Sequence, residues 1–305
     1  GSGALAPSGS GVRMVWNPRK GAFRAGSAFT QWDDANIGTA SVAMGQSTTA
    51  SGSESTALGA FSTASGAIST AIGGGTTASG QISTAMGNGT TASGNTSTAM
   101  GDQTTAAGSR STAMGFMNTA FSFGETVLGI GATPGPSPVG SSTSFGTGFT
   151  NTRILAVGNA IDANNNFTVD AAERSDALVI LKNGNTGLSV STPQTTLDVL
   201  GALAIRNNGT ITNVTADNQV VVVGNRGYVQ LSSNSAVAAA RTITLTDGLI
   251  TGQLLLIEAV TAGAFEIADN AANNTDVSLD RALAISDTIM LLWNGNDWLE
   301  LNYSD

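Results

Sequence analysis

The chain has 305 residues, of which 11% are charged, with a formal net charge of −9 and neither cysteine nor histidine. Without those two residue types, Ser-His and Cys-His catalytic groups, histidine-metal sites and disulfides are all excluded. The acidic balance argues against nucleic acid and anionic membranes as partners, and no apolar run is long enough for a transmembrane helix.

The N-terminal part predicts a flexible lead or tag over residues 1–11 and a cap over residues 12–40. The cap contains Trp16 and Trp32 and most of the charge of this part of the chain. A repeat structure needs an atypical unit to close its apolar interior, and aromatic side chains fill such space well. We therefore expect both tryptophans to lie in the core of the cap.

Residues 41–130 repeat every fourteen residues, as STALGAFSTASGAI, STAIGGGTTASGQI and STAMGNGTTASGNT illustrate. Glycine occupies two positions in each copy of the repeat, seven residues apart, such as Gly59 and Gly66. A glycine at every seventh position would cost a helix about 1 kcal/mol each relative to alanine. Two short strands and two turns per copy are favoured instead, and they predict a β-solenoid whose coils bury their apolar faces by stacking.

Each copy also has a large apolar residue before its first glycine, and an alanine before that. The large residues are Met44, Leu58, Ile72, Met86, Met100, Met114 and Leu128, and the alanines are Ala43, Ala57, Ala71, Ala85, Ala99 and Ala113. Neighbours in a strand point to opposite faces. We predict that the large residues fill the coil and that the alanines face outward, where other copies in a homotrimer cover them.

The pattern SxA(M/L/I)Gxx(S/T)(T/A)ASG resembles the head repeat of YadA-type trimeric adhesins. This resemblance implies a left-handed parallel β-roll with three chains around one axis, located at the cell surface or outside the cell. Together with the repeats and a distinct C-terminal part, the segments QWDDANIG, DALVILKNGNTG and LDV resemble the mosaic adhesive trimer fibres of predatory bacteria. In that family a trimeric shaft presents exchangeable tips to glycans of the prey envelope.

Residues 131–206 predict an irregular crossover, a β-hairpin and a neck. Three of the six prolines lie in its first part, and the Asn183-Gly184 pair is a hairpin-turn signal between two apolar runs. Within this region five residues occupy positions 1, 3, 5, 9 and 12 of a calcium-loop template: Asp162, Asn164, Asn166, Asp170 and Glu173. Phe167 stands where the template has glycine, so a polar surface loop is the favoured interpretation and a calcium site is the alternative.

Residues 207–305 contain strand-like runs every ~8 to 12 residues, which predict a compact antiparallel β-sandwich. Its end, LLWNGNDWLEL, resembles the receptor-binding ends of phage tail fibres. Sugars stack on aromatic rings and are oriented by fixed polar groups, so the candidate ligand-binding residues are Arg226, Tyr228 and Trp298. Trp293 and Trp298 also fit a cross-strand pair that locks the terminal hairpin.

The sequence as a whole predicts an all-β, homotrimeric adhesin fibre that is not an enzyme and needs no cofactor. Its C-terminal tip is expected to recognise glycans or other envelope polymers of a target cell, with neutral or amino sugars favoured by the acidic charge. Two alternatives remain open. Threonine pairs such as Thr76-Thr77 and Thr90-Thr91 are compatible with ice binding, and Asp297 with Glu300 is a carboxylate pair for tail-spike-like glycan hydrolysis.

Overall fold

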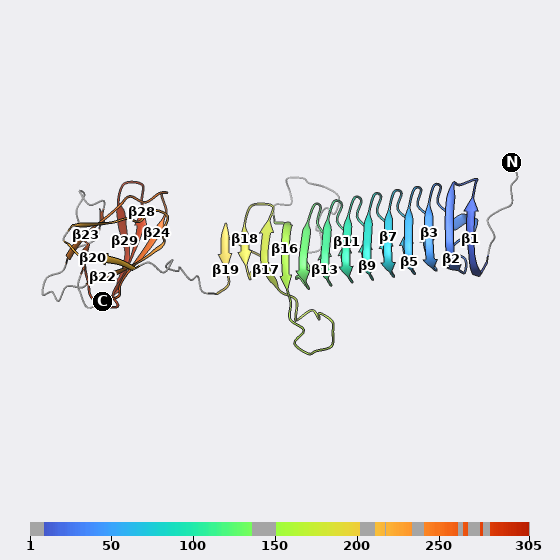
Figure 1. The fold of residues 1–305 in the computed structure, drawn as a ribbon. Helices are drawn as coiled ribbons and strands as arrows, with labels where there is room; N and C mark the ends of the chain where they lie inside the picture. Colours follow the sequence, from blue (N-terminus) through green and yellow to red (C-terminus); the bar gives the residue numbers. More distant parts are fainter. Residues whose placement is uncertain are drawn as a thin grey trace. The chain divides into compact units, whose positions relative to one another are not determined.

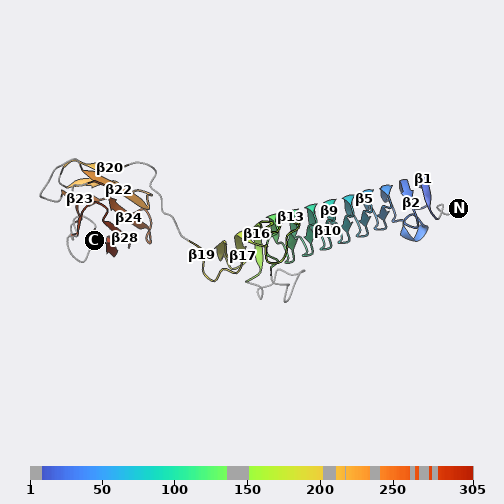
Figure 2. The same ribbon diagram turned by 90° about the horizontal axis from the view of Figure 1, so that it is seen from below.

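The computed structural model describes residues 9–135, 151–201, 211–216, 218–233, 241–261, 265–267, 275–276 and 281–304. These residues form β-strands and one short 3-10 helix, η1 (Asp34–Asn36). The chain divides into two compact units, residues 1–202 and 203–305 (Figures 1 and 2). Each unit has its own hydrophobic core.

The first unit is a β-roll built from one long sheet and one short sheet. The long sheet contains, in order, β1 (Gly11–Asn17), β2 (Ala22–Ala28), β3 (Val42–Gln46), β5 (Thr56–Ala60), β7 (Thr70–Gly74), β9 (Thr84–Asn88), β11 (Thr98–Asp102), β13 (Thr112–Phe116), β15 (Thr126–Ile130), β16 (Arg153–Asn159), β17 (Asp176–Leu181), β18 (Thr186–Leu188) and β19 (Leu197–Val199) (Figure 1). The short sheet contains β4 (Thr49–Ala50), β6 (Thr63–Ala64), β8 (Thr77–Ala78), β10 (Thr91–Ala92), β12 (Thr105–Ala106) and β14 (Thr119–Ala120). Neighbouring strands from β3 to β15 are parallel and in register with the fourteen-residue repeat, as predicted.

Each coil turns at two corners whose residues have a left-handed backbone, such as Phe61 and Ile68 with φ of 56° and 58°. This conformation costs a residue other than glycine about 1–2 kcal/mol. The corner N–H groups donate to the preceding coil, Phe61 to the Gln46 carbonyl and Ile68 to the Ser53 carbonyl, each at 2.8 Å. Stacking therefore offsets the cost of the corners. Stacking also explains why every coil has glycine at the position of Gly59, because a Cβ on Gly59 would overlap the carbonyl oxygen of Gly73 in the next coil.

The interior of the β-roll is lined by alanine, which corrects our assignment of the two faces. The fully buried alanines are Ala43, Ala50, Ala57, Ala64, Ala71, Ala78, Ala85, Ala92, Ala99, Ala106, Ala113 and Ala120. Met44, Met86 and Met114, expected inside, are 43%, 37% and 37% exposed on the outer face of the long sheet. Between Ser41 and Ser111 the buried side chains are alanine, serine and threonine, so the interior of a fourteen-residue coil holds small side chains and its methionines and leucine lie outside.

Arg24 and Trp32 close the N-terminal end of this interior. Both side chains are buried; Arg24 donates to the carbonyls of Ser41 and Ala50 at 2.9 Å, and Trp32 Nε1 donates to the Thr48 carbonyl at 2.9 Å. Burial lowers the pKa of the Arg24 guanidinium to about 10.

The cap prediction is confirmed for Trp32 and wrong for Trp16, which is 61% exposed. Trp16 lies on β1, the edge strand of the long sheet, and strand alternation turns it outward together with Val12 and Met14.

Beyond the repeats, β16 pairs in parallel with β15, and β17 returns antiparallel to β16. The predicted hairpin is present: β17 and β18 are antiparallel and Gly184 in their turn has φ of 90°. In the neck, β19 pairs in parallel with β18. Residues 136–150 of the predicted crossover and residues 202–206 of the neck lie outside the described residues.

The second unit is a two-sheet sandwich, as predicted. One sheet contains β20 (Ile211–Val214), β22 (Tyr228–Ser233), β24 (Leu254–Ala259), β28 (Thr288–Trp293), β29 (Trp298–Ser304) and β26 (Thr275–Asp276); the other contains β21 (Gln219–Val221), β23 (Arg241–Leu245), β25 (Phe265–Ile267) and β27 (Arg281–Leu283). The pairing is mixed rather than antiparallel throughout. From β20 to β25 the chain alternates between the sheets, so that strands adjacent in one sheet run parallel, whereas β24, β28 and β29 are antiparallel.

Candidate functional site

Three loops of the sandwich, residues 222–227, 246–253 and 294–297, meet at one end. Gln253 ties two of them together, because its Nε2 donates to the carbonyls of Gly224 and Arg226 at 2.8 and 3.0 Å. The N–H of Gly252 donates to the Trp293 carbonyl at 2.8 Å, which brings in the third loop. We call this region the loop end. Its loops are held on a rigid scaffold, the usual setting for binding residues.

Trp298 lies beneath the loop end, and its prediction as a ligand contact is wrong. Its side chain is fully buried, and Nε1 donates to the carbonyl of Thr246 at 3.0 Å. The ring lies 5.4 Å from that of Trp293, directly opposite across β28 and β29. The cross-strand pair is therefore confirmed. β29 is an inner strand of its sheet, between β28 and β26, and every second side chain on it faces the other sheet. Trp298 is one of these side chains, and its bond to Thr246 supports the loop 246–253 from inside the sandwich.

The loop end exposes both apolar and polar groups. A cavity of about 280 Å³ is lined by Asn225, Leu249, Ile250, Thr251, Gly252 and Gln253. Leu249 and Ile250 are 68% and 72% exposed, while Arg226, next to Asn225, is half-buried. Apolar surface beside a few fixed polar groups is the composition of small-ligand sites.

Tyr228 continues from the loop end onto the outer face of the six-stranded sheet. Its hydroxyl donates to Oε2 of Glu258 on β24, and Nε2 of Gln230 donates to the same oxygen at 3.0 Å. The hydrogen bond from the Tyr228 hydroxyl lowers the pKa of Glu258 most, and the hydrogen bond from Gln230 lowers it further. Burial and then the Glu258 carboxylate raise the pKa of Tyr228. At neutral pH this cluster therefore presents an ionised carboxylate beside a neutral phenol.

Sequence reasoning missed Gln230 and Glu258. The available signal was the alternation in LLLIEA, in which Leu255 and Ile257 are buried and Glu258 must point to the opposite face. Only the parallel pairing of β22 with β24 brings Glu258 to Tyr228.

The second candidate site is the loop Asp162–Glu173. Its backbone turns as the calcium template requires even without glycine, because Phe167 itself has a left-handed φ of 62°. The Asp162 carboxylate accepts the N–H groups of Asn166 and Phe167 at 3.1 and 2.9 Å. The Glu173 carboxylate accepts the N–H groups of Ala163 and Asp170 at 2.9 and 3.0 Å.

The side chains of this loop also bind one another. Nδ2 of both Asn164 and Asn166 donates to Oδ2 of Asp170, at 2.8 and 3.1 Å. Across the part of the chain that the structure describes, no three acidic, His or Cys residues are grouped as metal ligands. The polar-loop interpretation and the calcium alternative both remain predictions.

Comparison with known families agrees with the two units. Residues 37–62, 63–90 and 92–116 match the YadA head domain repeat, and residues 213–299 match the phage depolymerase C-terminal beta sandwich domain. The comparison with curated proteins gave no match. Within the described ranges, no helix has the length and apolar character needed to cross a bilayer.

The chain thus combines an adhesin-type β-roll with a sandwich of the kind found in phage depolymerases. The matches concern these two domains and do not extend to the mosaic fibres of predatory bacteria, so that closer resemblance stays a prediction.

Proposed function

We propose that this protein is a homotrimeric adhesive fibre, located at the cell surface or outside the cell, whose C-terminal sandwich recognises glycans or other envelope polymers of a target cell. The matches to YadA head repeats and to a phage depolymerase C-terminal domain support the two halves of this proposal. It assigns the chain a binding role rather than a catalytic one.

The observation that carries the trimer is a continuous apolar column on the outer face of the long sheet, which we call the apolar ladder. Its members, one from each strand, are Met14, Ala25, Met44, Leu58, Ile72, Met86, Met100, Met114, Leu128, Val157, Leu178, Leu188 and Val199. None of these side chains is buried in the single chain. An exposed apolar stripe across thirteen strands is a surface that other copies of the chain would cover.

Recognition by the sandwich is supported by the loop end. Exposed Leu249 and Ile250 line the same cavity as Asn225, Thr251 and Gln253, so a sugar ring would find both apolar surface and fixed polar groups. Arg226 follows Asn225 in the chain, and its carbonyl is held by Gln253. A weak site is sufficient in a trimer, because three copies on one axis raise avidity by roughly 10² to 10⁴ where geometry allows. The net charge of −9 favours neutral or amino sugars over anionic ones.

A glycan array probed with the full chain tests this proposal. We expect a signal that falls when Arg226→Ala or Ile250→Ser is introduced at the loop end. Val220→Ser is the matched control, since Val220 is 55% exposed on β21 of the other sheet. Binding that is absent, or that both loop-end variants retain at full strength, would overturn the assignment.

The ice-binding alternative loses half of its expected surface. Thr76 and Thr90 are fully buried, whereas Thr77 and Thr91 lie half-exposed on the short sheet. Only one threonine of each pair is therefore available to order water. Ice-growth inhibition by the full chain at the level of known antifreeze activity would reverse the ranking.

The hydrolase alternative rests on Asp297, in the loop 294–297, and Glu300, on β29. Release of reducing sugar from a bound glycan, abolished by Glu300→Gln, would favour hydrolysis over binding.

A further inference from the structure

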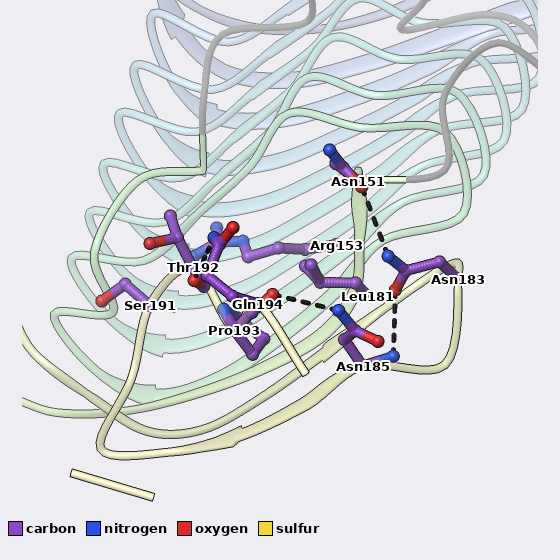
Figure 3. Close-up of a pocket in the computed structure, with 9 residues that line it drawn as sticks. All are labelled: Asn151, Arg153, Leu181, Asn183, Asn185, Ser191, Thr192, Pro193 and Gln194. Carbon is purple, nitrogen blue, oxygen red and sulfur yellow. Dashed lines mark hydrogen bonds between the residues drawn. The ribbon is translucent and has the colours of Figure 1, made fainter. Parts of the chain in front are cut away.

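A polar pocket lies in the first unit, between the β17–β18 turn and the connection from β18 to β19 (Figure 3). Its volume is about 310 Å³, at the lower end of the range of small-ligand sites. Its lining residues are Asn151, Arg153, Leu181, Asn183, Asn185, Ser191, Thr192, Pro193 and Gln194. The pocket belongs to the first unit and shares no residue with the loop end.

The walls of this pocket are tied together by amide side chains (Figure 3). Asn183 Nδ2 donates to Oδ1 of Asn151 at 3.3 Å, and Asn183 Oδ1 accepts the N–H of Asn185 at 2.9 Å. Asn185 Nδ2 then donates to the Pro193 carbonyl at 3.2 Å, which joins the turn to the connection opposite. The Gln194 N–H donates to the Asp198 carboxylate at 3.1 Å. The pocket is therefore held open by its own hydrogen bonds and needs little ordering when a ligand binds.

These amides keep unused hydrogen-bonding capacity. Asn151 Nδ2 is a donor, and Asn185 Oδ1 and Gln194 Oε1 are acceptors, without a partner among the residues that the structure describes. The hydroxyl of Thr192 can both donate and accept, and that of Ser191, which donates to Oγ1 of Thr133 at 3.5 Å, can still accept. A sugar hydroxyl both donates and accepts, so closely spaced hydroxyl groups complement this mixture of donors and acceptors.

The charges around the pocket favour a neutral ligand. Arg153 is the one charged side chain in the lining, and it is only 2% exposed, with Nη2 2.7 Å from Oε1 of Glu125. Its charge is thus already paired with Glu125 and Asp176 inside the β-roll, so the lining residues themselves offer neither a free cation nor a carboxylate. Leu181 and Pro193 add apolar surface for the C–H face of a ring.

We propose that this pocket binds a neutral polyhydroxylated ligand, a single sugar unit of a larger glycan. The fibre would then contact carbohydrate with its shaft as well as with its tip. The inference rests on the pocket alone and holds whether or not the loop end binds glycans.

Ligand-observed NMR and calorimetry of the full chain with glucose, galactose, mannose and N-acetylglucosamine test it, with galacturonate and glucosamine as charged counterparts. We expect saturable binding of at least one neutral sugar, at about 1 mM or tighter. Asn151→Ala and Gln194→Ala should each weaken it about five- to tenfold, the effect of losing one neutral hydrogen bond.

A control variant and a common background establish that the sugar binds in this pocket and not elsewhere on the chain. Asn88→Ala removes an exposed amide that donates to Asp102 on the neighbouring strand, and it should leave binding unchanged. Ile250→Ser at the loop end is the common background for all of these variants, so that the sugar binding that remains reports on this pocket and not on the tip. Unchanged melting of each variant establishes that the fold is intact. Lack of binding by every neutral sugar, tighter binding of the charged counterparts, or full binding by both pocket variants would overturn the proposal.

Discussion

The guanidinium of Arg153 lies 2.7 Å from the carboxylate of Glu125 at the C-terminal end of the alanine-lined interior, and both side chains are buried. The other Glu125 oxygen accepts the N–H groups of Phe121 and Ser122, each at 2.8 Å. Glu125 occupies the repeat position that is serine in earlier coils, such as Ser111. A carboxylate has therefore replaced a hydroxyl where the repeats end. Its burial is tolerated because Arg153 neutralises its charge.

Removing one partner of this pair should destabilise the first unit. Glu125→Gln leaves the buried Arg153 charge with only the more distant carboxylate of Asp176, 3.8 Å away, and we expect the free energy of unfolding to fall by about 3–5 kcal/mol. Chemical denaturation of the full chain measures the change. The triple variant Glu125→Leu, Arg153→Met and Asp176→Asn should recover most of the loss, because no charge of this buried cluster remains. A single-variant cost below about 1 kcal/mol would show that the pair is solvated.

Adjacent residues of one strand should respond oppositely to the same charge, because Ala85 faces the interior and Met86 belongs to the apolar ladder. Ala85→Asp buries an unpaired carboxylate and should unfold the β-roll. Met86→Asp should leave each chain folded but reduce its mass in native mass spectrometry from trimer to monomer. Met86→Leu is the control and should retain the trimer. An intact trimer in the Met86→Asp variant would contradict the assignment of the ladder.

Tyr228→Phe should raise the pKa of Glu258 towards its ordinary value, because the phenol is the main group that lowers it. A carboxyl with a lowered folded pKa stabilises the fold above its unfolded pKa, and this contribution is lost as pH falls through the folded pKa. Tyr228 has a raised pKa, so its contribution is present below the unfolded value near 10 and declines above it.

The stabilisation from this pair should therefore be flat between about pH 4.5 and 10, where Glu258 is ionised and Tyr228 neutral. NMR titration of the Glu258 side-chain carboxyl in the full chain and in the variant measures the pKa. Gln230→Leu should raise it less than Tyr228→Phe does, since the Gln230 bond is the second cause. Equal pKa values in the wild type and the Tyr228→Phe variant would exclude the proposed bond.

Thermal melting in calcium and in chelator distinguishes the two interpretations of residues 162–173. Asp162 and Glu173 already accept backbone N–H groups, so we expect the transition of the first unit to be the same in both conditions. A bound ion at a hundred times its dissociation constant would instead add about 2.7 kcal/mol of stability. A calcium-dependent rise that Asp162→Asn abolishes would establish the site.

The fourteen-residue period was sufficient to predict the β-roll and its coil boundaries, and the Asn183-Gly184 pair was sufficient to predict the hairpin. The period did not indicate which face of each strand lies inside, because alternation only separates Ala85 from Met86. The choice depends on the width of the closed coil, which is a tertiary property. The same limit explains the error at Trp16, whose exposure follows from the position of β1 at the sheet edge.

In the sandwich, the spacing of apolar runs predicted the strands but not their partners. Tyr228 meets Glu258 because the chain switches sheets after every strand from β20 to β25, and no local pattern encodes that order. Trp298 was placed in its hairpin correctly, yet its burial depends on the second sheet packed against it. Contacts between strands that are distant in the sequence therefore could not be predicted from the spacing of the apolar runs.

The contact of Gly59 with the carbonyl of Gly73 recurs from Gly73 to Gly87 and from Gly87 to Gly101, so neighbouring coils are interchangeable modules. Deleting one module of fourteen residues, for example 70–83, would shorten the roll by one strand spacing of about 4.8 Å while the ends built around Arg24 and Arg153 stay intact. Duplication would lengthen it by the same step. The number of modules thus sets the length of the β-roll, and recombination between these similar copies would change that length without altering either end of the roll.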